Sequence, residues 1–366
     1  MIRCIGVLSV GLGVLGVCSP SDRAAGGSRT PGAETRPVLP GIGRHLGSVP
    51  DRFRAYDVVA VPDKDEAEWW AGAPSILRDN EGTFWMAARM RTAEAPLGRR
   101  GYEIRISRSR DGLRFEPAAS IRREDVPIEG FERPALLQDP KTGRYKLYAC
   151  GPVNGVWCIL KFDDADRPDR FVPSSARPVI TPTERAGNRP PEQTVGRYHR
   201  GPALPTMYKD PVLILAEGRY HCYVIGQLGT ERLFHFISDD GEGFRPVGHL
   251  SESLLPLAGW HDYAVRPASV LPLGVGYLFV YEGSSARWAD PVYNIATGLA
   301  FTFDLHHLVD LTPEAPMLLS TTPGRLHTWR YSHWIWVDRE LWVYAEVEKS
   351  NGAHEVRRFR IPLAAP

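Results

Sequence analysis

Three carboxylates in this sequence stand where short apolar runs begin or end, and they are the first candidates for chemistry. Asp210 lies between Lys209 and a proline, Glu132 precedes Arg133 and a proline, and Glu282 follows a run of large apolar residues. Two carboxyl groups on either side of a scissile bond can act as a general acid and as a base or nucleophile. These three can share a reaction only if the fold brings them together.

A proline-headed hairpin recurs along the chain and contains each of these carboxylates. In each copy a polar or small residue and a proline open an apolar run, and a turn leads to a second strand rich in tyrosine and valine. Proline is tolerated there because the opening position of a strand has no ladder partner to lose. Four copies start at 72–74, 132–134, 209–211 and 265–267, and a fifth copy without the proline starts at 331–333.

A second repeated element, Ser-x-Asp-Gly-x-x-Phe, occurs at 109–115 and 238–244, each time after an alternating strand. Serine and aspartate side chains hydrogen-bond neighbouring backbone amides, and glycine adopts the left-handed conformation. The element therefore predicts a turn that joins a third strand to a fourth strand. Its aspartates are expected to be structural.

These repeats predict an all-β protein, a five-bladed β-propeller with four antiparallel strands per blade over residues 51–366. The 35 Gly, 32 Pro and 37 aromatic residues agree with many turns and strands and disfavour a helical bundle. A pair of β-sandwiches would not explain why proline recurs at the head of the first strand.

With these repeats the chain resembles the five-bladed propeller glycosidases, the superfamily of glycoside hydrolase families 43, 32 and 68. The resemblance covers about residues 55–365. It rests on Lys-Asp-Pro at 209–211, on the Ser-x-Asp-Gly turns, and on Tyr-Glu-Gly at 281–283 followed by 295–300. It implies an oligo- or polysaccharide partner and hydrolysis of a glycosidic bond by two carboxyl groups.

The sequence departs from that family at two of the positions that hold its carboxylates. Ala73 stands where the first blade of the family has an aspartate, and Val265 stands where a later blade has a glutamate. Asp210 alone is carried over. Either the chemistry has moved to Glu132, Glu282 or Asp262, or the protein is a surface carbohydrate-binding propeller without turnover.

In a propeller, the starts of the first strands and the ends of the second strands meet at one mouth. We expect Glu132 and Glu282 there as the acid/base pair, with Asp210 orienting the sugar or tuning the acid. Residues that would bind substrate at the same mouth are Arg133, Arg266, Asp262, His261, Arg89 and Trp70, and the convergent set also includes Tyr331, Ser332 and Glu346.

His333 is a candidate metal ligand, since it resembles a fifth-blade histidine that lies beside an axial cation in some family 43 enzymes. The expected reaction requires no cofactor, and the resemblance allows a structural calcium. Cys150 and Cys158 flank a turn, so they could form a disulfide across a hairpin or be two buried small apolar residues.

The N-terminus predicts export. Residues 5–17 are apolar but too short for a stable membrane span, so 1–18 is interpreted as a secretory signal. Cys18 ends a lipoprotein-like box in which Val17 replaces the usual small residue, and both a lipid anchor and ordinary cleavage remain open. Residues 19–50 are predicted to be a disordered linker. The mature protein would be extracytoplasmic and have no transmembrane span.

The overall charge excludes a polyanion partner. A formal net charge of +1 gives no global field that would hold a nucleic acid, so none is expected.

Overall fold

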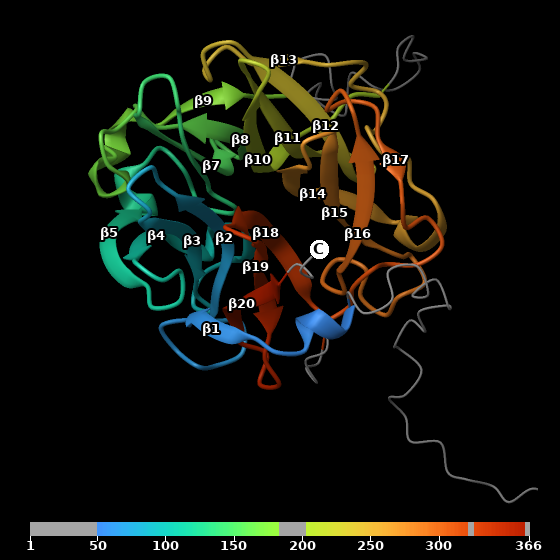
Figure 1. The fold of residues 1–366 in the computed structure, drawn as a ribbon, viewed down its shortest axis with the longest axis horizontal. Coiled ribbons are helices and arrows are strands. Elements are labelled where there is room, and N and C mark those ends of the chain that lie inside the picture. Colours follow the sequence, from blue (N-terminus) through green and yellow to red (C-terminus); the bar gives the residue numbers. More distant parts are fainter. Residues whose placement is uncertain (1–49, 183–202, 321–325, 363–366) are drawn as a thin grey trace, which may run out of the picture. The chain divides into compact units, whose positions relative to one another are not determined.

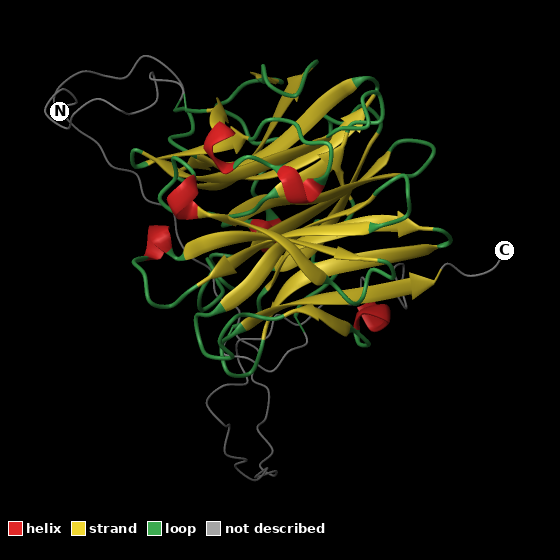
Figure 2. Ribbon diagram, turned by 90° about the vertical axis from the view of Figure 1, so that its left-hand side faces the viewer, coloured by secondary structure: helices red, strands yellow, loops and turns green. Residues whose placement is uncertain are grey.

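The computed structural model describes residues 50–182, 203–320 and 326–362, all within one unit, Val38–Pro366. The predicted signal and linker, including Cys18, lie outside these residues apart from Pro50. Within the described part, no helix has the length and apolar character needed to cross a membrane. The predicted all-β class is confirmed, because the helical elements described are short 3-10 turns (Figure 2).

The strands form five groups. Group 1 comprises β2 (Trp70–Arg78), β3 (Phe84–Arg91), β4 (Gly101–Ser109) and β5 (Glu116–Arg122). Group 2 comprises β6 (Ala135–Gln138), β7 (Tyr145–Val153), β8 (Val156–Lys161) and β9 (Arg177–Ile180). Group 3 comprises β10 (Tyr208–Ala216), β11 (Arg219–Leu228), β12 (Thr230–Ser238) and β13 (Arg245–Pro246). Group 4 comprises β14 (Ala264–Pro272), β15 (Tyr277–Ser284), β16 (Ala296–Thr302) and β17 (Val309–Asp310). Group 5 comprises β18 (Trp329–Val337), β19 (Glu340–Glu348), β20 (His354–Pro362) and β1 (Asp57–Ala60).

The 3-10 turns lie between these strands. They are η1 (Pro50–Phe53), η2 (Leu97–Arg99), η3 (Arg123–Asp125), η4 (Pro168–Arg170), η5 (Pro173–Ser175) and η7 (Gly259–His261).

Strands within each group pair antiparallel in sequence order, except that β1 pairs with β20 as the outer strand of group 5. Groups 1 and 5 form one continuous sheet through a single parallel pair, Trp70 with His354. The sequence repeat did not place β1, which comes before the first hairpin and completes the group made by the last hairpin.

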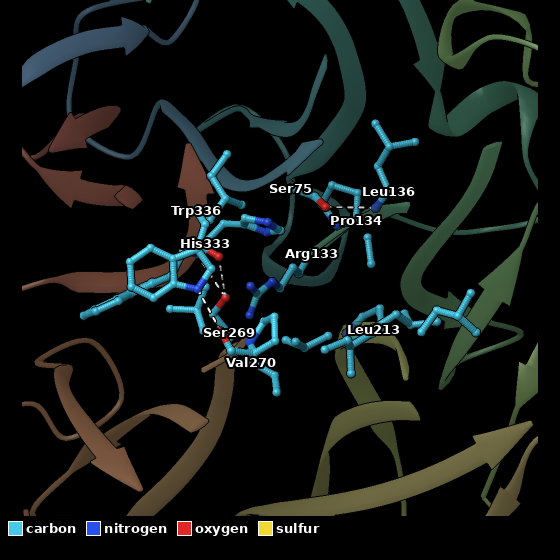
Figure 3. A pocket seen from close by; sticks show the side chains of 18 residues that line it. Ser75, Arg133, Pro134, Leu136, Leu213, Ser269, Val270, His333 and Trp336 are labelled. Atoms are coloured by element: carbon cyan, nitrogen blue, oxygen red, sulfur yellow. Dashed lines mark hydrogen bonds between the residues drawn. The ribbon is translucent and has the colours of Figure 1, made fainter. Parts of the chain in front are cut away.

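The groups surround a common centre (Figure 1), and the first strand of each contacts the next in the cyclic order β2, β6, β10, β14, β18 and back to β2. A cavity of about 350 Å³ lies between these five strands, lined by residues of every one of them (Figure 3). The arrangement is consistent with a β-propeller. It brings the starts of the first strands together around the common centre.

The repeated turn forms as predicted. Asp111 Oδ1 accepts hydrogen bonds from the N–H groups of Leu113 and Arg114, both at 2.9 Å. In the second copy, Asp240 accepts the corresponding bonds from residues 242 and 243, at 2.7 and 2.9 Å. The glycine of each turn, Gly112 or Gly241, accepts a hydrogen bond from a tyrosine hydroxyl of a neighbouring group. The turns therefore join the groups to one another.

Replacing Gly241 with alanine is expected to lower the free energy of unfolding by about 2 kcal/mol. Gly241 has φ = +79°, and an added Cβ would lie 2.7 Å from the Tyr148 hydroxyl. Gly143→Ala is the matched control, because Gly143 has φ = +72° and open space around it. Urea unfolding should show that Gly241→Ala loses more unfolding free energy than Gly143→Ala. Equal losses of unfolding free energy would contradict a role for the Tyr148 contact.

Candidate active site

Three of the first strands share the same irregularity near their starts. The pairing register shifts between Gly72 and Ser75, between Lys209 and Val212, and between Arg330 and His333. Each bulge contains a left-handed residue.

These residues are Ala73, Asp210 and Tyr331, with φ of +49°, +56° and +54°. Aspartate tolerates this region of φ/ψ space, whereas alanine and tyrosine rarely enter it. Ala73 thus has the backbone conformation of Asp210 without its carboxylate. The site must obtain a second carboxylate from elsewhere.

Glu132 and Asp210 both lie close to the Tyr331 hydroxyl. That oxygen is 3.5 Å from Glu132 Oε2 and 3.4 Å from Asp210 Oδ2. The two carboxylate oxygens can therefore be no more than about 7 Å apart, an upper limit compatible with the separations that two-carboxylate glycosidases use. Burial, followed by the charges of Asp210 and Glu132, raises the pKa of Tyr331 well above its usual value, so the hydroxyl keeps its proton as a donor.

Glu132 is favoured as an ionised carboxylate. Burial alone would raise its pKa, but the guanidinium groups of Arg89, Arg91 and Arg330 outweigh burial and lower it. Arg89 forms an ion pair with Glu132. The Glu132 side chain is 22% exposed, so a ligand can reach it.

Asp210 is favoured in its protonated form. It is almost fully buried, and burial is the main cause of its raised pKa. Lys209 opposes this shift, while the charges of Glu132 and Glu231 add to it. Environments that move two carboxyl pKa values in opposite directions are typical of an acid and a base that work together.

The sulfur atom of Cys150 contacts both the backbone and the side chain of Asp210. The Cys150 Sγ atom accepts a hydrogen bond from the Asp210 N–H at 3.0 Å and lies 3.5 Å from Asp210 Oδ1. Cys150 and Cys158 are both free and buried, so the reading as small apolar residues is correct and the cross-hairpin disulfide is not formed. Burial raises the pKa of the Cys150 thiol, which stays neutral.

Glu346 is the most heavily bonded carboxylate at this end of the strands. It accepts hydrogen bonds from Ala73 N at 2.9 Å, from Arg89 Nη2 at 2.8 Å and from His354 Nδ1 at 2.6 Å. Arg330 donates two more, at 2.9 and 2.8 Å. Although burial opposes it, this donor set holds the pKa of Glu346 well below its usual value. Glu346 is therefore a fixed anion that orients arginines, and the buried Arg89 between Glu346 and Glu132 is a positioning residue.

Glu282 is buried and hydrogen-bonded to the backbone of β18. Its Oε1 atom accepts a hydrogen bond from Ser332 N at 2.9 Å, and its side chain is fully buried. Burial raises its pKa, and the charge of Arg133 opposes that shift. Glu282 thus contacts the backbone of β18, and its Oε2 atom has no hydrogen-bond partner within the described residues. The shared contact with Tyr331 favours Asp210 over Glu282 as the partner of Glu132.

Arg133 crosses the centre of the molecule. Its guanidinium donates hydrogen bonds to Pro267 O at 2.9 Å and to Ala268 O at 2.6 Å, both in β14. Figure 3 shows it projecting into the cavity between the first strands. Both donors are bonded to backbone carbonyls of the protein itself. Arg133 therefore links the segment that precedes β6 to β14.

Arg266 is paired with a residue that the sequence analysis missed. Glu231, at the start of β12, forms ion pairs with both Arg266 and Lys209. Burial raises the pKa of Glu231, but these two cations lower it to about 2. The starts of the third strands lie at the same mouth as the ends of the second strands. Applied to the sequence, that rule would have identified Glu231 as a residue of the mouth.

His261 and Asp262 make hydrogen bonds within group 4. His261 Nε2 lies 3.0 Å from Asp310 Oδ2, and Asp262 Oδ1 accepts a hydrogen bond from Ala286 N at 2.8 Å. His261 is buried. Neither side chain contacts the Glu132 and Asp210 pair.

Trp70 is buried inside a stack rather than open to a sugar ring. It lies on His354 with ring centroids 4.0 Å apart and planes 9° apart, and the Arg91 guanidinium lies 3.6 Å from its ring centroid.

The surroundings of His333 do not fit a metal ion. His333 lines the central cavity together with Arg133, and burial followed by the Arg133 charge lowers its pKa to about 3. Within the described ranges, no group of three or more His, Cys, Asp or Glu side chains is arranged to hold a metal. The residues that line the cavity with His333 include no carboxylate, and the Arg133 charge would repel a cation, so we assign no step to calcium.

The fold is one that structurally characterised glycoside hydrolases have. No family model matches the sequence, and no curated protein matches it. A solved glycoside hydrolase superposes with a TM-score of 0.62 at 13% identity, covering 89% of this chain and 96% of that one. The β-1,2-mannobiose phosphorylase from Listeria innocua gives 0.57 at 13% identity, with 83% and 94% covered. An α-L-arabinofuranosidase from Lactobacillus brevis gives 0.55 at 13% identity, with 81% and 91% covered. At such identities the likeness concerns the fold.

Proposed function

We propose that this protein is a glycoside hydrolase in which Asp210 and Glu132 act as the acid and the base or nucleophile. The observation that supports this most is the pair itself: both carboxylates lie within 3.5 Å of the Tyr331 hydroxyl, and their pKa values are shifted in opposite directions. Glycosidic bond cleavage needs one protonated and one ionised carboxyl group across the bond.

Asp210 gives its proton to the glycosidic oxygen as the bond to the anomeric carbon breaks. Ionised Glu132 either takes a proton from the attacking water or attacks the anomeric carbon itself, with water completing the hydrolysis. Arg89 orients Glu132, and the Tyr331 hydroxyl lies close to both carboxyl groups.

We further propose a closed ring of five blades, each made of one strand group. Two observations support it: the first strands contact one another in a cyclic order, and β1 completes group 5 by pairing with β20. In such a ring each four-stranded sheet buries both faces against its neighbours.

The rate of this reaction should have a bell-shaped pH profile with an acidic optimum. Glu132 must be ionised, so kcat/KM should fall as the pH drops through its pKa, which is lowered from 4.5. Asp210 must be protonated, so kcat/KM should fall as the pH rises through its pKa, which is raised from 3.8. Initial rates across a pH series would measure both limbs, and Asp210→Asn should lose the alkaline limb. A flat profile through the acidic range would contradict the assignment.

A screen of aryl glycosides and of plant and bacterial polysaccharides tests the function itself. The hydrolase should release reducing ends from at least one of them, and Asp210→Asn should lose more activity on a natural glycan than on an aryl glycoside, whose leaving group needs little protonation.

The second candidate is a carbohydrate-binding propeller without turnover, and Ala73 favours it because that position lacks a carboxylate. It would bind a polysaccharide in the screen and release no product. For either function we propose an extracytoplasmic location, on the basis of the signal-like residues 1–18.

A further inference from the structure

Arg91, the last residue of β3, is a buried cation with few partners. Its side chain is 4% exposed, and within the described residues neither Nε nor Nη2 has a hydrogen-bond acceptor. Its ion-pair contact there is Glu68 Oε2, 3.9 Å from Nη2, and the half-exposed Glu68 also pairs with Arg100 at 2.5 Å. Burying a guanidinium with so little compensation costs free energy. Stability alone does not explain this residue.

The Arg91 guanidinium is nevertheless held in a fixed position. It lies 3.6 Å from the ring centroid of Trp70, which also stacks on His354. Cation–π contact with a desolvated tryptophan fixes the planar group without using its N–H donors. Trp70 Nε1 also lacks an acceptor within the described residues. The unused donors of Arg91 therefore belong to a fixed cation that is close enough to Glu132 to lower its pKa.

The local charges do not balance. Three arginines lie near two carboxylates, Glu132 and Glu346. The charges of Arg89, Arg91 and Arg330 all lower the pKa of Glu132, and those of Arg89 and Arg330 lower the pKa of Glu346. Glu346 is bonded to Arg89 and Arg330, and Glu132 is bonded to Arg89. The excess positive charge therefore resides on Arg91.

We propose that Arg91 belongs to an oxyanion subsite beside the Glu132 and Asp210 pair, which binds a negatively charged group of the ligand. The group is a carboxylate of an acidic sugar or a free phosphate, since both fit the planar fork of a guanidinium. Glu132 is 22% exposed, so the mouth is open next to Arg91. The inference rests on the proposed function, because it assigns a substrate class to the same mouth.

Calorimetric titration of the full chain tests the subsite with three probes: glucuronic acid, glucose and inorganic phosphate. Glucuronic acid or phosphate should bind at least about tenfold more tightly than glucose. Whichever of the two binds identifies the source of the anion. Equal affinities for all three probes would overturn the proposal.

Variants separate binding from folding. Arg91→Met should weaken anion binding at least about tenfold and leave the melting temperature unchanged or higher, because it removes a poorly paired buried charge. Arg91→Lys keeps the charge and should lose less anion affinity than Arg91→Met. It also tests the subsite if Arg91→Met does not fold. The matched control is Arg358→Met, since Arg358 lies 4.7 Å over Trp342 and pairs with Asp57 away from the mouth. The control should leave anion binding unchanged.

Two results would distinguish an error in the oxyanion subsite from an error in the proposed hydrolase activity. If a glycan is hydrolysed and Arg91→Met changes neither the rate on acidic glycans nor the affinity for glucuronic acid and phosphate, the hydrolase stands and the oxyanion subsite is wrong. If anions bind through Arg91 and no glycan is cleaved, the subsite stands and the hydrolase is wrong.

Discussion

Glu132→Gln is expected to lower kcat about a hundredfold or more while KM changes little. Glutamine keeps the size of the side chain and its contact with Tyr331, but it has no charge with which to activate water or attack carbon. The fold should persist, because Arg89 retains its hydrogen bond to Glu346 at 2.8 Å. Steady-state kinetics on a substrate from the screen would measure the loss, and a binding assay would show whether substrate is still held.

A control for Glu132 lies on the same loop. Glu129 is exposed, and its Oε1 atom accepts a hydrogen bond from Gly155 N at 2.7 Å. Glu129→Gln should leave kcat unchanged. If Glu132→Gln also kept full activity, the chemistry would have to lie elsewhere on the protein.

Glu346→Gln is expected to destabilise the protein by about 3 kcal/mol or more, because it leaves Arg330 and Arg89 without their buried anion. The effect should depend on pH. A carboxylate whose folded pKa is depressed stabilises the protein above its unfolded pKa, and that contribution is lost as the pH falls through the folded value. Denaturant unfolding at neutral and at acidic pH should therefore show a difference that shrinks in acid.

Glu340→Gln provides the comparison on the same strand, β19. Glu340 pairs with Arg360 at 2.8 Å, and both side chains are partly exposed, at 25% and 51%. Breaking such a surface pair should change stability by less than about 1 kcal/mol. Similar losses for the two variants would mean that the Glu346 network is not a main source of stability.

The sequence predicted the hairpins, the structural turns and the region of the mouth, because these follow from local patterns. Proline at strand starts and Ser-x-Asp-Gly turns are repeated features that act within a few residues. The rule that strand starts converge brought Glu132, Asp210 and Arg89 into one set, and the structure does place these three near one another.

The partners of these side chains could not be predicted, because they come from other strand groups. Glu282 hydrogen-bonds to Ser332 in group 5, a partner that its own hairpin does not indicate. Arg91 and Glu231 stand in ordinary strand positions, and only their neighbours across groups distinguish them. A linear pattern indicates which end of a strand a residue occupies, but not how deeply the neighbouring group covers it.

The pairing of β1 with β20 has a consequence for the order of folding. Asp57 and Arg358, which form an ion pair at 2.7 Å between these strands, are 301 residues apart in the chain. Contacts over such separations have a high loop-closure cost and make folding slow. During synthesis from the N-terminus, β1 emerges early and must wait for the last strand before it has a partner. The completed chain, rather than the nascent one, is therefore the unit that reaches the native state.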